Sequence, residues 1–217
     1  MRVRAVLFDF DGLLVDTETA AFHAWQRIFE EHGQMLSIDE WLPNVGVDPE
    51  PFDPRARLEE LVGSSLSWSE LDERRRVFRV AATSCCAGVR RILSETADRG
   101  LRTGIVTNSA LSWVAEHLEL VGLAPRFDCI LTRDDQQAPK PAPDAYQLAL
   151  QRLGVDPEST IAFEDSPSGI AAAQAAGIWC VAVPNHLTRR LPLTRADQIV
   201  ATLDDVSLSC LDERRRN

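Results

Sequence analysis

The chain has 217 residues, of which 45% are hydrophobic and 26% charged, and this composition is typical of a globular protein. Its formal net charge of −10 repels phosphate backbones and anionic lipid surfaces, so we expect neither a nucleic acid nor a membrane as a partner. The first apolar run stops at Asp9, which is too early for a signal peptide, and the five cysteines lack disulfide or zinc spacing. We therefore expect a cytoplasmic protein that works as a monomer.

Short apolar runs recur along the chain and predict buried strands. The first occupies residues 3–8 and ends abruptly at Asp9, Asp11 and Gly12, as a buried strand does where it enters a loop. Similar runs occupy residues 103–107, 129–132, 160–163 and 178–183, with a weaker one at 198–200. Helical patterns lie between them and imply right-handed crossovers. The sequence thus predicts an α/β protein with a Rossmann-like open parallel sheet covered by helices on both faces.

The helical segments can be located from their first residues and their periodicity. Ser109 is the candidate N-cap of a helix over residues 110–121, and Pro143 and Pro167 suit the first positions of two later helices. Residues 16–86 contain no buried strand and predict a helix over 20–32, a loop over 44–54 and a helix over 70–82. We therefore expect a catalytic core formed by residues 1–15 and 87–217, with an inserted helical cap domain over residues 16–86.

Residues capable of chemistry gather at the predicted carboxyl ends of the strands, where open parallel sheets bind their ligands. They are Asp9 and Asp11 after the first strand, Thr107, Asn108 and Ser109 after the second, Lys140 after the third, and Glu164 with Asp165 after the fourth. Each of these groups alone has an ordinary interpretation as a turn, a helix cap or a surface loop. Four such groups at one edge of a sheet are much harder to explain in that way.

The charges of these residues predict a metal ion. Four carboxylates and one ammonium leave three negative charges unbalanced, which is costly at buried strand ends unless a cation lies among them. Oxygen ligands without a nearby His or Cys suit Mg²⁺, which usually shares them with a phosphate. Residues 107–109 lead into a helix N-terminus, whose free N–H groups also favour a phosphate. We expect Mg²⁺ as the cofactor and a small phosphorylated metabolite as the substrate.

The four groups resemble the ordered motifs of the haloacid dehalogenase-like hydrolases, in their β-phosphoglucomutase-like branch with a helical cap. The motifs read Asp9-Phe10-Asp11-Gly12, Thr107-Asn108-Ser109, Lys140-Pro141 and Glu164-Asp165-Ser166. The resemblance implies that Asp9 is the nucleophile, which forms an aspartyl-phosphate. It also implies that Asp11 is the general acid and base, and that the Asp11 backbone carbonyl binds Mg²⁺.

The same resemblance assigns roles to the other motif residues. Thr107 and Lys140 would hold the transferring phosphoryl group, and Asn108 would help through its backbone. Asp165 would bind the metal, with Glu164 beside it. Lys140 is also the only lysine among 23 basic residues, so a compact ammonium is retained at this one position of an arginine-rich chain.

Residues that differ from those of other family members limit the reactions that we expect of this chain. Members that cleave phosphonates use a lysine of the cap, and residues 16–86 contain none. Sugar phosphate mutases of the branch usually place a histidine and an arginine where this chain has Ala21 and Pro49. We therefore expect a magnesium-dependent phosphatase that acts on a sugar or polyol phosphate. The alternatives are a β-phosphoglucomutase-like phosphomutase and a non-catalytic regulatory protein that retains the fold.

Several conspicuous residues of the inserted segment have less specific interpretations. Glu18 resembles a carboxylate of this branch and either contacts substrate hydroxyls or caps the hinge. Trp41 and Trp68 are expected in the apolar core of the cap. The arginine run at residues 74–76 lies beside glutamates and is expected on a solvated helix face.

Overall fold

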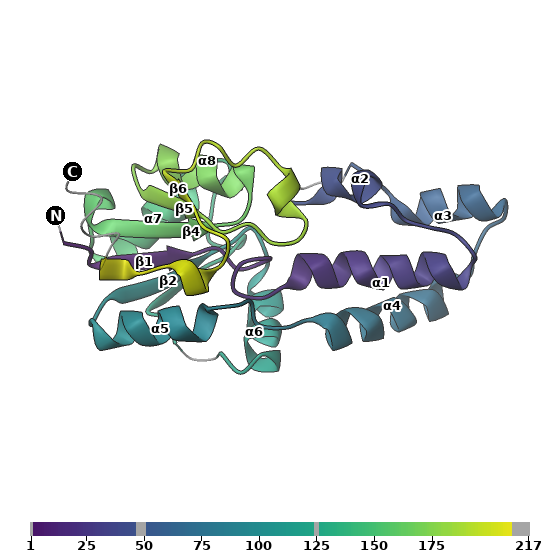
Figure 1. The fold of residues 1–217 in the computed structure, drawn as a ribbon, viewed down its shortest axis with the longest axis horizontal. Coiled ribbons are helices and arrows are strands. Elements are labelled where there is room, and N and C mark those ends of the chain that lie inside the picture. Colours follow the sequence, from purple (N-terminus) through teal and green to yellow (C-terminus); the bar gives the residue numbers. More distant parts are fainter. Residues whose placement is uncertain (1, 47–50, 124–125, 210–217) are drawn as a thin grey trace.

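The centre of the molecule is a six-stranded parallel sheet (Figure 1). The computed structural model describes residues 2–46, 51–123 and 126–209. The strands are β1 (Ala5–Phe8), β2 (Arg102–Val106), β3 (Cys129–Leu131), β4 (Thr160–Glu164), β5 (Trp179–Ala182) and β6 (Gln198–Ile199). Their order is β3-β2-β1-β4-β5-β6, so the sheet reverses its direction of winding between β1 and β4. The predicted α/β class and open parallel sheet are confirmed.

Alternate residues of the central strands face opposite sides of the sheet and build two separate cores. Val6 and Phe8 of β1 join one apolar cluster with helices α5 (Val89–Asp98) and α6 (Leu111–Leu120). Leu7 joins the other, with α7 (Asp144–Leu153) and α8 (Pro167–Ala175). Since side chains alternate along a strand, a continuous apolar run is buried on both faces. Helices therefore cover both faces of the sheet, as predicted.

Four further helices extend beyond the carboxyl ends of the strands (Figure 1). They are α1 (Thr17–Glu31), α2 (Ile38–Trp41), α3 (Pro54–Val62) and α4 (Trp68–Ala82). Their apolar side chains form a third cluster around Trp25, Phe29 and Leu58, and α1 packs along α4. Trp41 is buried in this cluster, as expected, whereas Trp68 is only half-buried at its edge.

The sequence pattern does not predict α2 and α3, which are short. The loop expected over residues 44–54 is wrong at both ends, because the 3₁₀ helix η1 (Leu42–Asn44) ends inside it and Pro54 begins α3. Asp53 caps α3 by accepting hydrogen bonds from two backbone N–H groups, and proline suits the first helical position. Residues 47–50 lie outside the described residues.

Ser109 is not the N-cap of α6, contrary to the prediction. That helix begins at Leu111 with Ala110 at the cap position. The Ser109 hydroxyl donates to Asp11 instead, at 2.6 Å, in a hydrogen bond that the charge of the carboxylate strengthens. The predicted first residues of the two later helices agree with the structure to within one residue. Helix α8 begins at Pro167, and α7 begins one residue after Pro143.

The two chain crossings between the sheet and helices α1–α4 lie side by side. The backbone N–H of Asp16 donates to the carbonyl of Ser84 at 2.8 Å, and that of Cys86 donates to Leu14 at 3.1 Å. Val15 and Cys85 form an isolated antiparallel bridge between them. The domain boundaries at residues 16 and 86 fall at this paired crossing and stay a prediction.

The remaining regular segments are short. They are the 3₁₀ helices η2 (Pro157–Ser159), η3 (Thr188–Arg190) and η4 (Leu203–Asp205). Over the described ranges, no helix combines the length and the apolar character that crossing a membrane requires. The frayed tail expected at residues 212–217 lies outside these ranges.

Candidate active site

A cleft of about 910 Å³ lies between the carboxyl ends of the strands and helices α1–α4. It is placed at the winding reversal between β1 and β4, which is where open parallel sheets bind ligands. Its lining contains all but one of the candidate site residues predicted from the sequence, namely Asp9, Asp11, Glu18, Thr107, Asn108, Ser109, Lys140 and Asp165. The exception, Glu164, is fully buried and contacts the site from within the protein.

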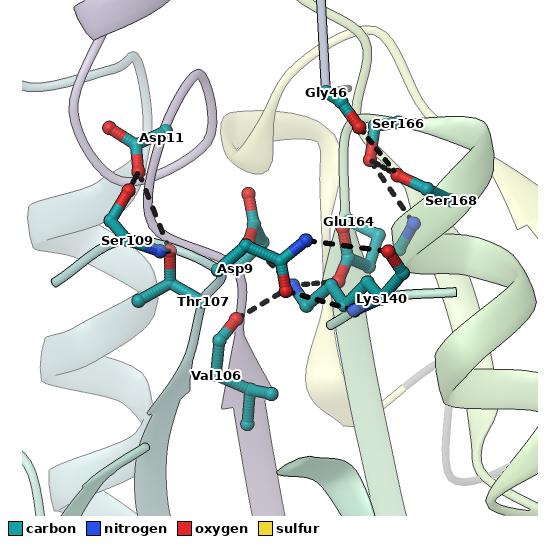
Figure 2. Close-up of polar contacts among 12 residues, drawn as sticks. Asp9, Asp11, Gly46, Val106, Thr107, Ser109, Lys140, Glu164, Ser166 and Ser168 are labelled. Carbon is teal, nitrogen blue, oxygen red and sulfur yellow. Dashed lines mark hydrogen bonds and ion pairs between the residues drawn. The ribbon is translucent and has the colours of Figure 1, made fainter. Parts of the chain in front are cut away.

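The ammonium group of Lys140 lies at the centre of the site (Figure 2). Its Nζ donates to Asp9 Oδ1 at 2.6 Å, to Glu164 Oε1 at 2.6 Å and to the Val106 backbone carbonyl at 2.7 Å. All three donors of the ammonium are used by these acceptors. Burial alone lowers the pKa of Lys140, but the carboxylates of Asp9 and Glu164 outweigh burial and raise it. Lys140 is therefore a fixed cation between two acids.

Asp9 follows β1 directly and is only 8% exposed. Burial raises the pKa of Asp9 most, Lys140 lowers it and Glu164 raises it again, which leaves it at about 7. Oδ1 is held by Lys140, while Oδ2 receives no hydrogen bond from the residues that the structure describes. Asp9 thus has one oxygen held in place and one available to react, and a further cation nearby would keep it ionised.

Glu164 ends β4 and is the second carboxylate that anchors Lys140. Its Oε1 also accepts a hydrogen bond from the phenol of Tyr146, which is fully buried on α7. Burial and the charge of Glu164 raise the pKa of Tyr146 well above its usual value, so the phenol stays neutral and donates. The sequence analysis misses this residue, although it is the only tyrosine of the chain and a buried hydroxyl on a predicted helix needs a partner.

Gly169 of α8 lies directly against the Glu164 carboxylate, and a methyl group added there would come within 1.8 Å of Oε2. Alanine normally stabilises a helix relative to glycine by about 1 kcal/mol. We expect the opposite sign for Gly169→Ala, a lower Tm, because Glu164 cannot move without leaving Lys140 and Tyr146. Thermal unfolding of the variant tests this, and a Tm equal to or above that of the parent protein would contradict it.

Three acids lie close enough to share a metal ion. Ligand oxygens of Asp9, Glu164 and Asp165 lie within 4.8 Å of one another, and all three residues are buried. Glu164 Oε2 is buried and has no hydrogen-bond partner in the described part of the chain. Burial, with the charges of Asp9 and Glu164, raises the pKa of Asp165 well above its usual value, so a nearby cation is needed to balance these acids. An oxygen-only ligand set of this kind fits Mg²⁺.

The Asp11 carboxylate stands apart from that set because donors from other elements hold both of its oxygens. Oδ1 accepts hydrogen bonds from the Thr17 hydroxyl at 2.7 Å and the Trp113 indole N–H at 2.8 Å. Oδ2 accepts one from the Ser109 hydroxyl at 2.6 Å and a longer one from Thr107 at 3.4 Å (Figure 2). Thr17 and Trp113 are not predicted from the sequence, and Ser109 is predicted at this edge of the sheet but without a contact to Asp11.

The Trp113 indole is placed between groups from two parts of the fold. Its ring centroid lies 3.9 Å from that of His117, one turn further along α6. The guanidinium of Arg79, from α4, lies 4.5 Å from the centroid of the Trp113 ring. Trp113 therefore links helix α4 to the carboxylate of Asp11.

Asn108 acts on Lys140 through its side chain. Its Oδ1 accepts hydrogen bonds from the Lys140 backbone N–H at 2.9 Å and from the Gln136 amide at 3.1 Å. The Thr107 hydroxyl meanwhile accepts one from the backbone N–H of Ser109 at 3.0 Å. The loop that carries Lys140 is thus tied to the end of β2. The phosphate contacts expected of Thr107 and Asn108 stay predictions.

The wall of the cleft opposite the strands is charged. Glu18 lines it from the first turn of α1, and its contact with substrate stays a prediction. Arg75 lines it too and lies 4.8 Å from the centroid of the Trp25 ring, so the expectation of a solvated arginine run is wrong at this residue. The run faces water only at Arg74 and Arg76, because α4 turns Arg75 toward α1.

Comparison with known proteins agrees with this site. The family of haloacid dehalogenase-like hydrolases matches residues 6–183. YhcW of Bacillus subtilis (strain 168) is 39% identical over 212 residues, 96% of each chain. A phosphorylated carbohydrates phosphatase of Thermotoga maritima is 34% identical over 180 residues, 81% of this chain and 82% of that protein. The crystal structure of CbbY from Rhodobacter sphaeroides in complex with phosphate is 26% identical, covers 94% of this chain and 96% of its own, and has a TM-score of 0.70. The chain therefore belongs to the haloacid dehalogenase-like hydrolases.

Proposed function

We propose that the protein is a magnesium-dependent phosphatase that hydrolyses a small phosphorylated metabolite, a sugar or polyol phosphate, through an aspartyl-phosphate on Asp9. The observation that carries the proposal is the buried ion pair of Asp9 Oδ1 with Lys140, whose ammonium also pairs with Glu164, at a residue that lines the cleft. The similarity to a phosphatase named for phosphorylated carbohydrates supports the substrate class.

In the first step, Asp9 Oδ2 attacks phosphorus and the bond from phosphorus to the ester oxygen breaks. Lys140 keeps the nucleophile in place through Oδ1 and supplies positive charge beside the transferring group. Asp11, in its protonated form, gives a proton to the departing alkoxide, which leaves as an alcohol. The products of this step are the free alcohol and the aspartyl-phosphate.

In the second step, water attacks the phosphorus of the aspartyl-phosphate. Asp11, now ionised, takes a proton from this water, and the bond from phosphorus to the Asp9 oxygen breaks. Inorganic phosphate leaves, Asp9 is again a carboxylate and Asp11 is again protonated, so the cycle is closed. The proton that Asp11 gives in the first step is replaced in the second.

Asp9, Glu164 and Asp165 would hold Mg²⁺, with the backbone carbonyl of Asp11 as a further ligand. When bound, the ion neutralises charge on the phosphoryl oxygens. Thr107 and the backbone of Asn108 would bind the same oxygens from the end of β2. Residues 16–86 would form a cap domain that excludes bulk water while Asp9 attacks phosphorus in the first step.

Trp113→Phe tests the role of Asp11 in this reaction. Phenylalanine fills most of the indole's space but cannot donate to Asp11 Oδ1, so we expect kcat to fall about 10-fold, as for the loss of one hydrogen bond to a charged group. Tm and KM should change little. Steady-state kinetics measure the effect, with Trp68→Phe as the control, because its indole N–H bonds to Glu59 outside the cleft. A fall in kcat no larger than that of the control would contradict the role.

The phosphomutase alternative is disfavoured by the cleft itself. Ala21 lines it at the position where the mutases usually carry a histidine, and its methyl group cannot bind a phosphate. The other departure, Pro49, lies outside the described residues. The non-catalytic alternative is disfavoured because the nucleophile, the acid, the lysine and the acid cluster occur together in one cleft.

The decisive test is release of inorganic phosphate by the purified protein from p-nitrophenyl phosphate and from a panel of sugar and polyol phosphates. We expect turnover with Mg²⁺, loss of turnover with excess chelator and recovery when Mg²⁺ is restored, because three buried acids need a divalent cation. Full activity in excess chelator would overturn the metal assignment. Isomerisation of a sugar phosphate without phosphate release would favour the mutase.

A further inference from the structure

Two arginines of α4 stand one turn apart in the wall of the cleft, and a tryptophan holds each of them. The guanidinium of Arg75 lies 4.8 Å from the ring centroid of Trp25, and that of Arg79 lies 4.5 Å from that of Trp113. Guanidinium groups stacked on aromatic faces are fixed in orientation, with their N–H edges left to bind other groups. Both side chains are half-buried, so they are neither core residues nor freely solvated ones.

The charge of Arg79 is not matched locally. The Arg79 Nε is buried without a hydrogen-bond partner, and none of the described carboxylates lies within ion-pair distance of its guanidinium. Burial and the neighbouring charge of Arg75 both lower the pKa of Arg79, while Glu116 and Asp11 oppose them from longer range. Two neighbouring guanidinium groups that repel each other in a partly desolvated wall are stabilised when an anion binds between them.

The arginines on either side of Arg75 differ from Arg79, because each of them has a close acidic partner. Arg74 pairs with Glu31 at 2.7 Å and Arg76 pairs with Glu73 at 2.7 Å, both on the more exposed side of α4. Arg75 lies 3.7 Å from Asp72, a carboxylate that already accepts two hydrogen bonds of 2.8 Å from Arg55. Arg79 is therefore the arginine of the cleft wall whose charge no described carboxylate balances at ion-pair distance.

The position of this pair separates it from the site of phosphoryl transfer. Lys140 serves Asp9 at the ends of the strands, whereas Arg79 reaches the Asp11 side of the cleft, with the Trp113 ring between its guanidinium and the Asp11 carboxylate. One cleft lining includes both sites, and its volume of about 910 Å³ exceeds the need of a single phosphoryl group. A substrate held at Asp9 by its phosphate can therefore extend toward α4.

We propose that Arg75 and Arg79 form a subsite for a second anionic group of the substrate, a carboxylate or a second phosphate. The preferred substrate is then a phosphorylated sugar acid or a sugar bisphosphate rather than a neutral sugar phosphate. This inference rests on the proposed function, because it takes the phosphate at Asp9 as the reacting group. In this proposal, residues of α4 in the wall of the cleft bind the substrate.

The test compares matched pairs of substrates. 6-Phosphogluconate and sorbitol 6-phosphate differ only in a carboxylate against a hydroxymethyl group, and fructose 1,6-bisphosphate differs from fructose 6-phosphate by one phosphate. We expect the parent protein to have a kcat/KM about 10-fold or more higher for the anionic member of at least one pair. The pair that shows the preference tells whether the second anion is a carboxylate or a phosphate.

Arg75→Gln and Arg79→Gln should each lower that ratio by about 10-fold, mainly through KM. Arg76→Gln, on the exposed side of the same helix, is the matched control and should leave the ratio unchanged. The ratio is the readout because any effect of Arg79 on Asp11 through Trp113 acts equally on both members of a pair and cancels. Thermal unfolding of each variant shows that α4 stays folded.

Equal kcat/KM values for both members of both pairs in the parent protein would overturn the proposal. So would Arg75→Gln and Arg79→Gln ratios no lower than that of Arg76→Gln. If the parent protein hydrolyses none of these compounds nor p-nitrophenyl phosphate, the proposed function fails. Calorimetric binding of 6-phosphogluconate, fructose 1,6-bisphosphate and their neutral counterparts to the same variants, with Mg²⁺ present, then decides the subsite separately.

Discussion

Asp9→Asn is expected to stop turnover, with a loss in kcat on the order of 10⁴ or more, because a neutral amide does not attack phosphorus. The variant should fold, since the substitution keeps the shape of the side chain and removes a buried negative charge from beside Glu164 and Asp165. Phosphate release from p-nitrophenyl phosphate in the presence of Mg²⁺ measures the loss.

The control for this variant is Asp98→Asn, which makes the same chemical change at an exposed residue at the end of α5. It should keep parental turnover. Activity of Asp9→Asn within a factor of about 10 of the control would mean that another group is the nucleophile.

Lys140→Arg is expected to lower kcat on the order of 10², as for the loss of one positioned charge donor in a dry site. Three acceptors converge on one point in the structure, at 2.6 to 2.7 Å from Nζ, and a planar guanidinium spreads its donors over a larger fork. Since the charge is kept, the fold should survive. Turnover and thermal unfolding are measured together.

Lys140→Met separates the charge from the shape of this side chain. It leaves Asp9 and Glu164 buried without their cation, so we expect a loss of unfolding free energy of about 3–5 kcal/mol in the absence of Mg²⁺.

The control for Lys140→Arg is Arg102→Lys, which exchanges the same two basic residues at a 62% exposed side chain. Parental turnover by Lys140→Arg would show that the lysine is not part of the reacting site.

The sheet could be predicted from the sequence because each strand is buried on both faces and therefore reads as a continuous apolar run. Residues 3–8 and 160–163 predict β1 and β4 to within two residues at each end. The short helices α2 and α3 could not be predicted in the same way, since a helix of one or two turns has too little periodicity to distinguish it from a loop rich in Pro and Asp. The family resemblance is confirmed by the match over residues 6–183.

Residues at strand ends could be placed near one another because parallel strands end at one edge, which brings Asp9 and Asp165 together. The residues that hold these side chains in place could not be predicted in this way. Tyr146 and Trp113 lie on helices, and the face that a helix turns toward a particular carboxylate depends on packing between segments far apart in the chain. The same holds for Arg75. The sequence predicts it on a charged surface, whereas in the structure its guanidinium lies over the ring of Trp25 of α1.

The central claim is that Asp9 carries the phosphoryl group between the two steps. A single turnover with a ³²P-labelled phosphate ester, quenched in acid and reduced with borohydride, would convert an aspartyl-phosphate into homoserine at the labelled position. Digestion with trypsin then gives the peptide of residues 5–27, and its fragmentation in a mass spectrometer distinguishes Asp9 from the other acids. We expect covalent label in the quenched protein and homoserine at residue 9. Homoserine at another residue, or phosphate release without any covalent label during the turnover, would contradict the account.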